Sequence, residues 1–254
     1  MVTCRLRNNG YYIFEGFGSA KVLCAFSTRL LGNMSLAYGS TQNSLKNRQG
    51  FLGALGVNYQ DLVCAKQVHA ARVEYVGEKD RGKGVLSHAD AIDGTDALIT
   101  DVRGVPLAVF SADCLSVFLY DPVKQAIGLT HAGWRSSKEK IAAKTVRAMQ
   151  ERFSTNPKDL LAALGPAIRS CCYEVSADLQ EFFPAHVSEK KGHYYLDLAA
   201  ENKHQLLSEG IKEENILDCE ICTVCQNDKF FSFRKEGVSC GRMMSVMALS
   251  EATT

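Results

Sequence analysis

The stretch 111-SADCLSVFLYDPVKQAIGLTHAGWR-135 lies near the middle of the chain and decides how the surrounding sequence is organised. Two apolar runs, 114–120 and 126–131, are short and bounded by turn residues, which predicts two strands. Between them, Asp-Pro-Val-Lys at 121–124 is typical of a type I turn, because proline after aspartate presets the second turn position. We therefore expect a β-hairpin with antiparallel strands.

The hairpin register brings a cysteine and a histidine together. If Tyr120 pairs with Gln125, Cys114 lies directly opposite His131. Opposed residues of an antiparallel pair have their Cβ atoms ~4.5 to 5.5 Å apart on one face. One metal ion, with bonds of ~2.0 to 2.3 Å to imidazole nitrogen and thiolate, can bridge that gap. The competing interpretation is ordinary packing, because free cysteine is often buried and a histidine at a strand end is often only hydrogen-bonded.

Further strands and helices surround the hairpin. Short apolar runs predict strands at 21–28, 62–69, 96–100, 105–110, 160–168, 216–224, 230–234 and 241–249. An apolar stripe at helical spacing predicts a helix over 136–153, and we expect shorter helices at 176–183 and 197–210. No internal repeat or Pro/Gly/Ser-rich linker divides the chain, so we expect one α/β domain spanning residues 1–254.

Composition narrows the class of protein. With 254 residues, 46% of them hydrophobic, the chain can bury roughly three quarters of its unfolded surface. The formal charge is +1, from 29 basic and 28 acidic residues, which argues against binding to nucleic acid or anionic lipid. No apolar run approaches the ~20 residues that span a bilayer, and no signal segment is evident. We expect a cytoplasmic protein whose 10 cysteines are mostly reduced.

A third metal ligand strengthens the interpretation of the hairpin. His69 ends the apolar run 62–69 as His131 ends its own predicted strand. The remaining histidines, which lie in polar stretches or on a helix of mixed composition, are His88, His186, His193 and His204. Two histidines and a thiolate at strand ends predict a His₂Cys zinc site with one open coordination position, which is the catalytic rather than the structural pattern.

Eight short motifs occur in a characteristic order. They are KQVH, DALIT, SADC, THAGWR, GPAI followed by CCYEV, CTVC, FFSFR and GRM. In this order the chain resembles the YfiH-type laccase-domain family, whose members are also called multicopper polyphenol oxidases and purine nucleoside phosphorylases. The resemblance runs from about Phe26 to Ala248. It implies a four-layer α/β/β/α sandwich of mixed sheets, similar to the catalytic domain of the cytotoxic necrotizing factor.

The resemblance also implies an activity and a set of site residues. It implies a zinc-dependent purine nucleoside phosphorylase that cleaves adenosine- or inosine-type nucleosides with phosphate, with adenosine deamination as a further activity. The family's zinc ligands fall on His69, Cys114 and His131. Asp113, beside Cys114, is a candidate proton carrier. The candidate substrate-binding residues, in which the two arginines are expected to hold the anion, are Arg48, Arg135, Asn33, Gln67 and Tyr173.

Several alternatives remain open on the sequence alone. The same site loaded with copper would suit a laccase-like polyphenol oxidase, although six histidines are few for a multicopper enzyme. Cys114 could instead be a covalent nucleophile activated by His131. A hydrolase of cell-wall precursors and a metal-binding protein without turnover are further candidates. The expected partners are a small nucleoside and phosphate, and the expected state is a monomer or homodimer.

A second cysteine pattern is interpreted differently. Cys219, Cys222 and Cys225 form C-x₂-C-x₂-C, a spacing that also occurs in zinc and iron–sulfur sites. In an extended strand, however, residues three apart face opposite sides of the sheet. No fourth ligand is evident nearby in the sequence. We therefore expect these cysteines, and the adjacent Cys171 and Cys172, to be packing residues.

Overall fold

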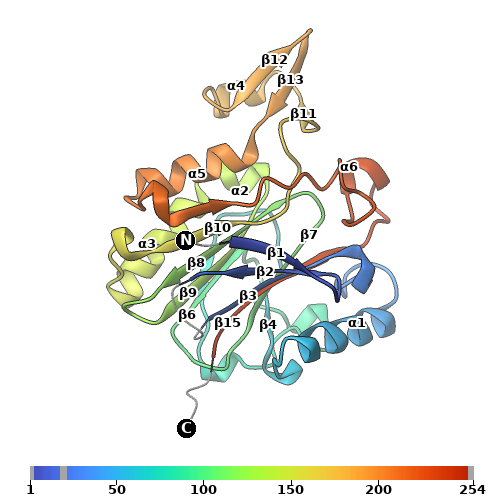
Figure 1. Cartoon of the computed structure of the whole chain (residues 1–254), viewed down its shortest axis with the longest axis vertical. Coiled ribbons are helices and arrows are strands. Elements are labelled where there is room, and N and C mark those ends of the chain that lie inside the picture. The colour runs from blue at the N-terminus through green and yellow to red at the C-terminus, as the bar shows by residue number, and fades with distance from the viewer. Residues whose placement is uncertain (1–2, 18–21, 251–254) are drawn as a thin grey trace.

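The computed structural model describes residues 3–17 and 22–250, which form two large mixed sheets, a small third sheet and several helices (Figure 1). The first large sheet contains, in spatial order, β1 (Thr3–Arg7), β2 (Tyr11–Glu15), β3 (Val22–Ser27), β15 (Met243–Leu249), β7 (Leu107–Ser111) and β4 (Val63–Cys64). The second contains β14 (Ile216–Asp218), β10 (Leu161–Leu164), β8 (Leu115–Asp121), β9 (Ala126–Ala132), β6 (Ala97–Thr100) and β5 (Val73–Tyr75). Parallel pairs β4–β7, β10–β14 and β5–β6 accompany the antiparallel ones.

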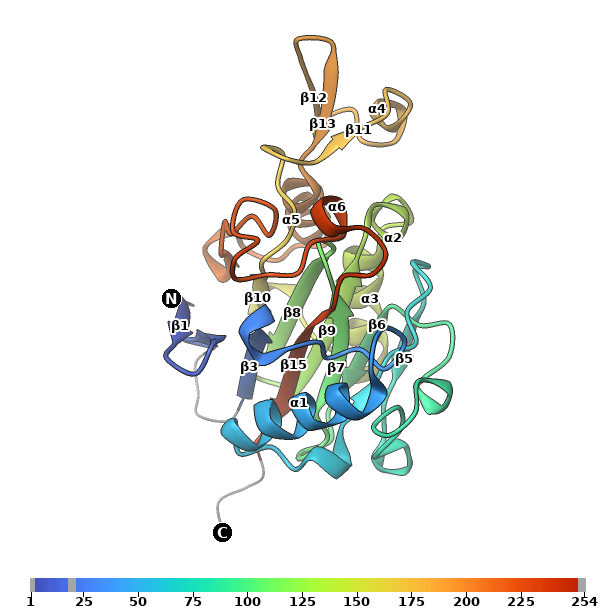
Figure 2. The ribbon, with the colours of Figure 1, turned by 90° about the vertical axis from the view of Figure 1, so that its right-hand side faces the viewer.

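The apolar core lies between the two large sheets and under the helices. Side chains such as Phe26 and Met247 from the first sheet pack against Phe118 and Leu129 from the second. Helix α1 (Thr41–Ala54) covers the outer face of the first sheet, and α3 (Ile141–Phe153) and α5 (Leu198–Ser208) cover that of the second (Figures 1 and 2). Burial of these apolar faces is the main term that stabilises the fold.

The small sheet and three short helices complete the fold. The small sheet is built from β11 (Glu174–Val175), β13 (His193–Leu196) and β12 (Val187–Lys190), and with α4 (Leu179–Phe182) it projects from the top of the view in Figure 1. Helix α2 (Trp134–Lys138) follows β9, and α6 (Phe233–Glu236) precedes β15. Within residues 3–17 and 22–250, no helix combines the length and the hydropathy needed to cross a membrane.

The predicted hairpin is confirmed as β8 and β9, but its predicted register is wrong by two residues. Ser116, not Cys114, lies opposite His131, because the pairing begins at Asp121 and Ala126. The Asp121 carboxylate accepts hydrogen bonds from the backbone N–H groups of two turn residues, which keeps Asp121 at the end of its strand. A shift of two residues leaves every side chain on its predicted face.

Other predicted strands within the described residues are confirmed with small changes at their ends. These are β3, β6, β7 and β15, and the predicted start of the first at Lys21 lies outside the described residues. The predicted helix over 136–153 is divided into α2 and α3, because Lys140 adopts a left-handed conformation with φ of 62°. The apolar stripe is placed correctly, since Ile141, Val146 and Met149 are buried.

Four predicted strands are wrong in whole or in part. The run 160–168 forms a strand only over β10, which ends at Leu164. β4 ends at Cys64, so 65–69 is a loop. β14 ends at Asp218, and the chain then turns through 222–229. The segment 230–234 leads into α6, which Ser232 caps by accepting a hydrogen bond from the Lys235 N–H. In the last three cases polar side chains provide hydrogen-bond partners that the apolar pattern does not reveal.

Candidate functional site

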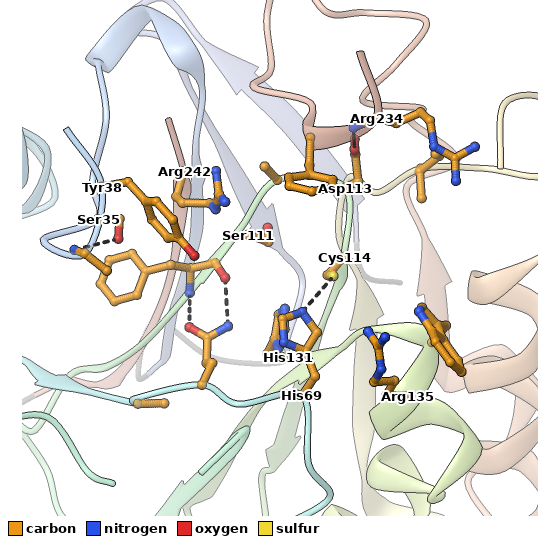
Figure 3. A pocket seen from close by; sticks show the side chains of 18 of the residues that line it. Ser35, Tyr38, His69, Ser111, Asp113, Cys114, His131, Arg135, Arg234 and Arg242 are labelled. Carbon is orange, nitrogen blue, oxygen red and sulfur yellow. Dashed lines mark hydrogen bonds between the residues drawn. The ribbon is translucent and has the colours of Figure 1, made fainter. Parts of the chain in front are cut away.

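The three predicted metal ligands converge, although they come from three separate segments (Figure 3). His69 lies in the loop after β4, Cys114 directly precedes β8, and His131 lies in β9. Their ligand atoms all lie within 4.8 Å of one another, and the Cys114 Sγ is 3.9 Å from the His69 Nε2. His131 is buried, Cys114 is half-buried and His69 is exposed. The group is therefore anchored on one side and open to solvent on the other.

A buried carboxylate holds both histidines in place. Asp96 precedes β6 and is fully buried. Its Oδ1 lies 2.8 Å from the His131 Nδ1 and accepts a hydrogen bond from the His69 backbone N–H at 3.1 Å. Its Oδ2 accepts hydrogen bonds from the backbone N–H groups of Val68 and Ala70. The carboxylate thus fixes the His131 proton on Nδ1, which leaves Nε2 free to bind a metal, and it folds the His69 loop.

A glycine makes room for the ligands. Gly133 follows β9, and by the hairpin register it lies near Cys114. A Cβ atom at this position would lie 2.9 Å from the His69 Cδ2 and 3.1 Å from the Cys114 Sγ. Both distances are shorter than ordinary van der Waals contacts, so the approach of the two ligands requires glycine here.

The pKa values of Cys114 and His131 are shifted in opposite directions. Burial of Cys114 opposes its ionisation, but the imidazoles of His131 and His69 outweigh burial and lower the pKa of the thiol to about 6. Burial also opposes a charged His131, while the Cys114 thiolate and the Asp96 carboxylate raise the pKa of this histidine to about 10. At neutral pH, Cys114 is therefore a thiolate, the form in which cysteine binds metals and acts as a nucleophile.

The three side chains face a cavity of about 460 Å³. Its polar and aromatic wall comes from both large sheets and from the segments above them, as Figure 3 shows. The aromatic residues that line it are Tyr38, Phe110, Trp134, Tyr173 and Phe233. A cavity of this size, with convergent polar groups and apolar rings, suits a small organic ligand.

Four arginines also line the cavity, namely Arg48, Arg135, Arg234 and Arg242. Each of them lies over an aromatic ring of the wall: Arg48 over Phe110, Arg135 over Trp134, Arg234 over Tyr173 and Arg242 over Tyr38. Across the described part of the chain, no carboxylate forms an ion pair with any of the four, so their charge is not neutralised by the protein. The cavity therefore favours an anionic group.

Most of the predicted substrate residues line this cavity. Gln67 does so while its amide exchanges two hydrogen bonds of 2.7 Å with the backbone of Phe110. Tyr173 also lines the cavity, and burial raises the pKa of its phenol. Asn33 instead lines a smaller neighbouring cavity, where its side chain holds the turn that contains Ser35.

Arg48 is almost fully buried beneath the cavity. It is 2% exposed, and its Nε and Nη1 donate to the backbone carbonyls of Met34, Gly84 and Val85. Its guanidinium also lies over the ring of Phe110, 4.6 Å from the centroid. The helix that carries it, α1, was not predicted, because it buries a serine and this arginine beside two apolar residues and so lacks an apolar stripe.

Asp113 is buried beside Cys114, but its carboxylate is occupied by the protein. Its Oδ1 accepts a hydrogen bond from the Thr223 hydroxyl at 2.6 Å. Its Oδ2 accepts from the Ser232 hydroxyl at 3.0 Å and from the Arg234 backbone N–H at 2.7 Å. Asp113 thus joins the Cys114 segment to the two loops above the cavity.

Sequence reasoning missed Asp96 and two of the arginines. Asp96 begins the motif DALIT, and a charged residue at the start of a buried strand is a signal that could have identified it. Arg234 and Arg242 stand in the motifs FFSFR and GRM, but only the fold brings these segments beside the metal ligands.

Comparison with known proteins places the chain in a family. The family model described as "Multi-copper polyphenol oxidoreductase laccase" matches residues 27–250. The chain belongs to this laccase family. The resemblance inferred from the eight motifs is therefore confirmed, and the matched residues include all three candidate metal ligands.

Relatives and solved structures of the laccase family agree with this placement. The chain is 35% identical over 221 residues to "Purine nucleoside phosphorylase YlmD" of Bacillus subtilis, covering 82% of this chain and 78% of that protein. It is 33% identical to "Adenosine deaminase RL5" from an unknown prokaryotic organism, covering 73% of this chain and 75% of that protein. The crystal structure of YlmD from Geobacillus stearothermophilus superimposes with a TM-score of 0.93 at 32% identity, covering 98% of this chain and 99% of that one.

Proposed function

We propose that this chain is a zinc-dependent purine nucleoside phosphorylase that cleaves adenosine- or inosine-type nucleosides with phosphate and also deaminates adenosine. The observation that carries the proposal is the group of His69, Cys114 and His131, which faces a cavity lined by four arginines. None of these arginines forms an ion pair within residues 3–17 and 22–250. The names of the relatives, purine nucleoside phosphorylase and adenosine deaminase, support the same chemistry.

The donor set fits zinc. Two imidazoles and a thiolate are ligands that zinc accepts, and a three-residue set leaves a fourth position open, as in catalytic zinc sites. The hydrogen bond that the His131 Nδ1–H donates to Asp96 is the usual support of a metal-binding histidine. When bound, zinc supplies Lewis acidity and activates water. The thiolate next to imidazole would also suit a covalent nucleophile, but such a mechanism gives no role to His69.

Other residues of the cavity are suited to bind the phosphate and the purine base. Phosphorolysis forms a bond from a phosphate oxygen to C1′ of the ribose, while the bond from C1′ to the purine nitrogen breaks and its electron pair leaves with the purine. Arg135 and Arg234 can hold the phosphate close to C1′, because guanidinium groups form strong hydrogen bonds to phosphate oxygens. The rings of Phe110 and Tyr173 offer flat apolar surfaces to the purine.

For Asp113 we propose a positioning role rather than that of a proton carrier. Three hydrogen bonds from Thr223, Ser232 and Arg234 already occupy both carboxylate oxygens. Asp113 also has a left-handed backbone with φ of 83°, a conformation that aspartate and asparagine tolerate better than most residues. The carboxylate therefore sets the direction of the chain into Cys114.

The test is a direct assay of products. Purified protein loaded with zinc should convert adenosine and phosphate to adenine and ribose 1-phosphate, and a slower formation of inosine would report deamination. His69→Ala should abolish both activities without unfolding the protein, because His69 is exposed. The matched control is His193→Ala, an exposed histidine on β13. Adenine formed equally fast without phosphate would indicate hydrolysis, and no product from any nucleoside would refute the proposal in favour of a binding protein.

Copper-dependent polyphenol oxidation is the second candidate, because the description of the family names copper. Only two histidines join Cys114 in the metal-binding group, which is few for several copper ions. Oxygen-dependent oxidation of a phenol after copper loading, lost in His131→Ala, would favour this candidate over the phosphorylase.

The domain organisation, the layer architecture, the localisation and the oligomeric state are also proposals. We propose that residues 1–254 form one domain and that its layers correspond to the four-layer α/β/β/α sandwich of the cytotoxic necrotizing factor. The packing of helices outside two face-to-face sheets supports this correspondence. We also propose a cytoplasmic monomer or homodimer, which the 10 free cysteines support, because thiols persist in reducing compartments.

A further inference from the structure

A second group of sulfur atoms lies apart from the proposed zinc ligands. The Sγ atoms of Cys171, Cys172, Cys222 and Cys225 all lie within 4.8 Å of one another. The Cys225 sulfur is 3.4 Å from that of Cys172 and 3.7 Å from that of Cys171. Four thiolates arranged around zinc with bonds of ~2.3 Å have their sulfurs about 3.8 Å apart. We propose that these four cysteines form a second, structural zinc site.

The fold brings the two cysteine pairs together from distant parts of the sequence. β10 and β14 are parallel neighbours, so the chain leaves both strands at the same edge of the second sheet. Beyond the strands the two segments stay paired, because Ala167 and Cys222 form an isolated parallel bridge. The Ala167 N–H donates to the Ile221 carbonyl and its carbonyl accepts from the Thr223 N–H, both at 3.1 Å. The convergence of the cysteines therefore belongs to the backbone of the fold.

Local turns aim the side chains at a common point. The Gln226 N–H donates to the Cys222 carbonyl at 3.0 Å, which closes one helical turn and places Cys222 and Cys225 on the same side. The N–H groups of Cys172 and Tyr173 both donate to the Arg169 carbonyl, which closes the other turn. The expectation that C-x₂-C would point to opposite faces assumed a strand, and it is wrong here for that reason.

The surroundings suit a thiolate–metal site with no open position. The Cys222 sulfur lies against the backbone N–H groups of Cys225, Arg169 and Val224, which can hydrogen-bond to a thiolate. Donors of this kind offset the negative charge that four thiolates leave on a zinc ion. Four sulfur ligands in tetrahedral array are the pattern of structural rather than catalytic zinc. Cys219, the first cysteine of the same motif, lies outside the group.

A metal at the four-cysteine site would fix the positions of two segments that adjoin the cavity. Cys172 directly precedes Tyr173, which lines the cavity. Cys222 directly precedes Thr223, whose hydroxyl donates to Asp113 beside Cys114. A metal that joins the two turns would therefore hold both contacts in place without touching the substrate.

The experiment measures zinc content in variants. Protein produced with zinc and purified with a reducing agent and without a chelator should contain about two zinc ions per chain. Cys225→Ala should contain about one, and should still fold because Cys225 is exposed. The matched control is Cys219→Ala, from the same motif, which should keep two. His69→Ala should contain one zinc ion per chain, and the double variant of His69 and Cys225 should contain none. The zinc contents of the two single variants therefore show which of the two proposed sites, if either, does not bind zinc.

If Cys225→Ala does not fold, a second measurement on the unaltered protein still tests the proposal. Zinc should slow the alkylation of Cys171, Cys172 and Cys225 by iodoacetamide at least ~10-fold relative to chelator-treated protein, as read by mass spectrometry. Replacement of zinc by cobalt should give the absorption of a four-sulfur site, and Cys225→Ala should remove it. Equal alkylation with and without zinc, or a zinc content unchanged in Cys225→Ala, would overturn the proposal, as would a disulfide between Cys172 and Cys225 in zinc-free protein.

Discussion

Asp96→Asn tests whether one carboxylate organises the candidate zinc site. Asp96 accepts four hydrogen bonds, two on each oxygen, from the His131 ring and from the N–H groups of residues 68–70. Asparagine keeps one of the two oxygens, so its NH₂ group faces two donors whichever way the amide turns. Each buried donor without an acceptor costs about 1 to 3 kcal/mol. One donor is left unpaired if the His131 ring changes its tautomer to accept from the amide, and two are left unpaired in the other orientation. The free energy of unfolding, measured by urea denaturation, should therefore fall by about 1 to 6 kcal/mol.

The same substitution should weaken zinc binding. When the amide NH₂ faces His131, the ring relieves the clash by moving its proton from Nδ1 to Nε2, the atom that faces Cys114 and His69. Loss of such a supporting carboxylate typically lowers metal affinity about 10- to 100-fold. A competition titration against a chromophoric chelator measures this. The control is Asp101→Asn, just beyond the other end of β6, where an exposed carboxylate accepts one hydrogen bond from Tyr75. Equal zinc affinity in the two variants would refute the reasoning.

Three other substitutions test separate parts of the structure. Gly133→Ala places a Cβ against His69 and Cys114, so zinc affinity should fall at least ~10-fold in the same titration, and an unchanged affinity would show that the ligands can move aside. Gly50→Ala, on the exposed face of α1 with no atom within 4 Å of the new Cβ, should raise the free energy of unfolding by ~0.5 to 1 kcal/mol, and a loss of stability in urea would contradict this. Arg135→Gln should raise the KM for phosphate at least ~10-fold in steady-state assays, since a charge-assisted hydrogen bond contributes about 1.5 to 3 kcal/mol, and an unaltered KM would place phosphate elsewhere.

The hairpin shows what an apolar pattern can and cannot predict. Two short apolar runs and the Asp-Pro turn were enough to locate β8 and β9 and to assign Cys114 and His131 to one face. The register was not predictable in this way, because it depends on the Asp121 carboxylate, which accepts two backbone hydrogen bonds in the turn. The predicted register differs from the observed one by two residues. Because side chains alternate between the faces of a strand, a shift of two residues keeps Cys114 and His131 on the same face, as the metal-ligand hypothesis requires.

Polar contacts between distant segments account for most of what the sequence did not reveal. His69 was expected at a strand end, but three N–H groups around it bond to Asp96 instead of to a neighbouring strand. The cysteines of the C-x₂-C-x₂-C motif were assigned to a strand because the turn that follows β14 was not predicted. The partners of Cys222 and Cys225 are Cys171 and Cys172, at least 50 residues earlier in the chain, and they meet because β10 and β14 are parallel neighbours.

The four cavity arginines affect the rate at which an anionic ligand associates with the protein. The formal charge of the chain is +1, and subtracting the four cavity arginines leaves −3 for everything else. The four arginines therefore attract diffusing anions toward the cavity, where low-dielectric walls focus the field. The rate of association of a small anion should accordingly decline as ionic strength rises.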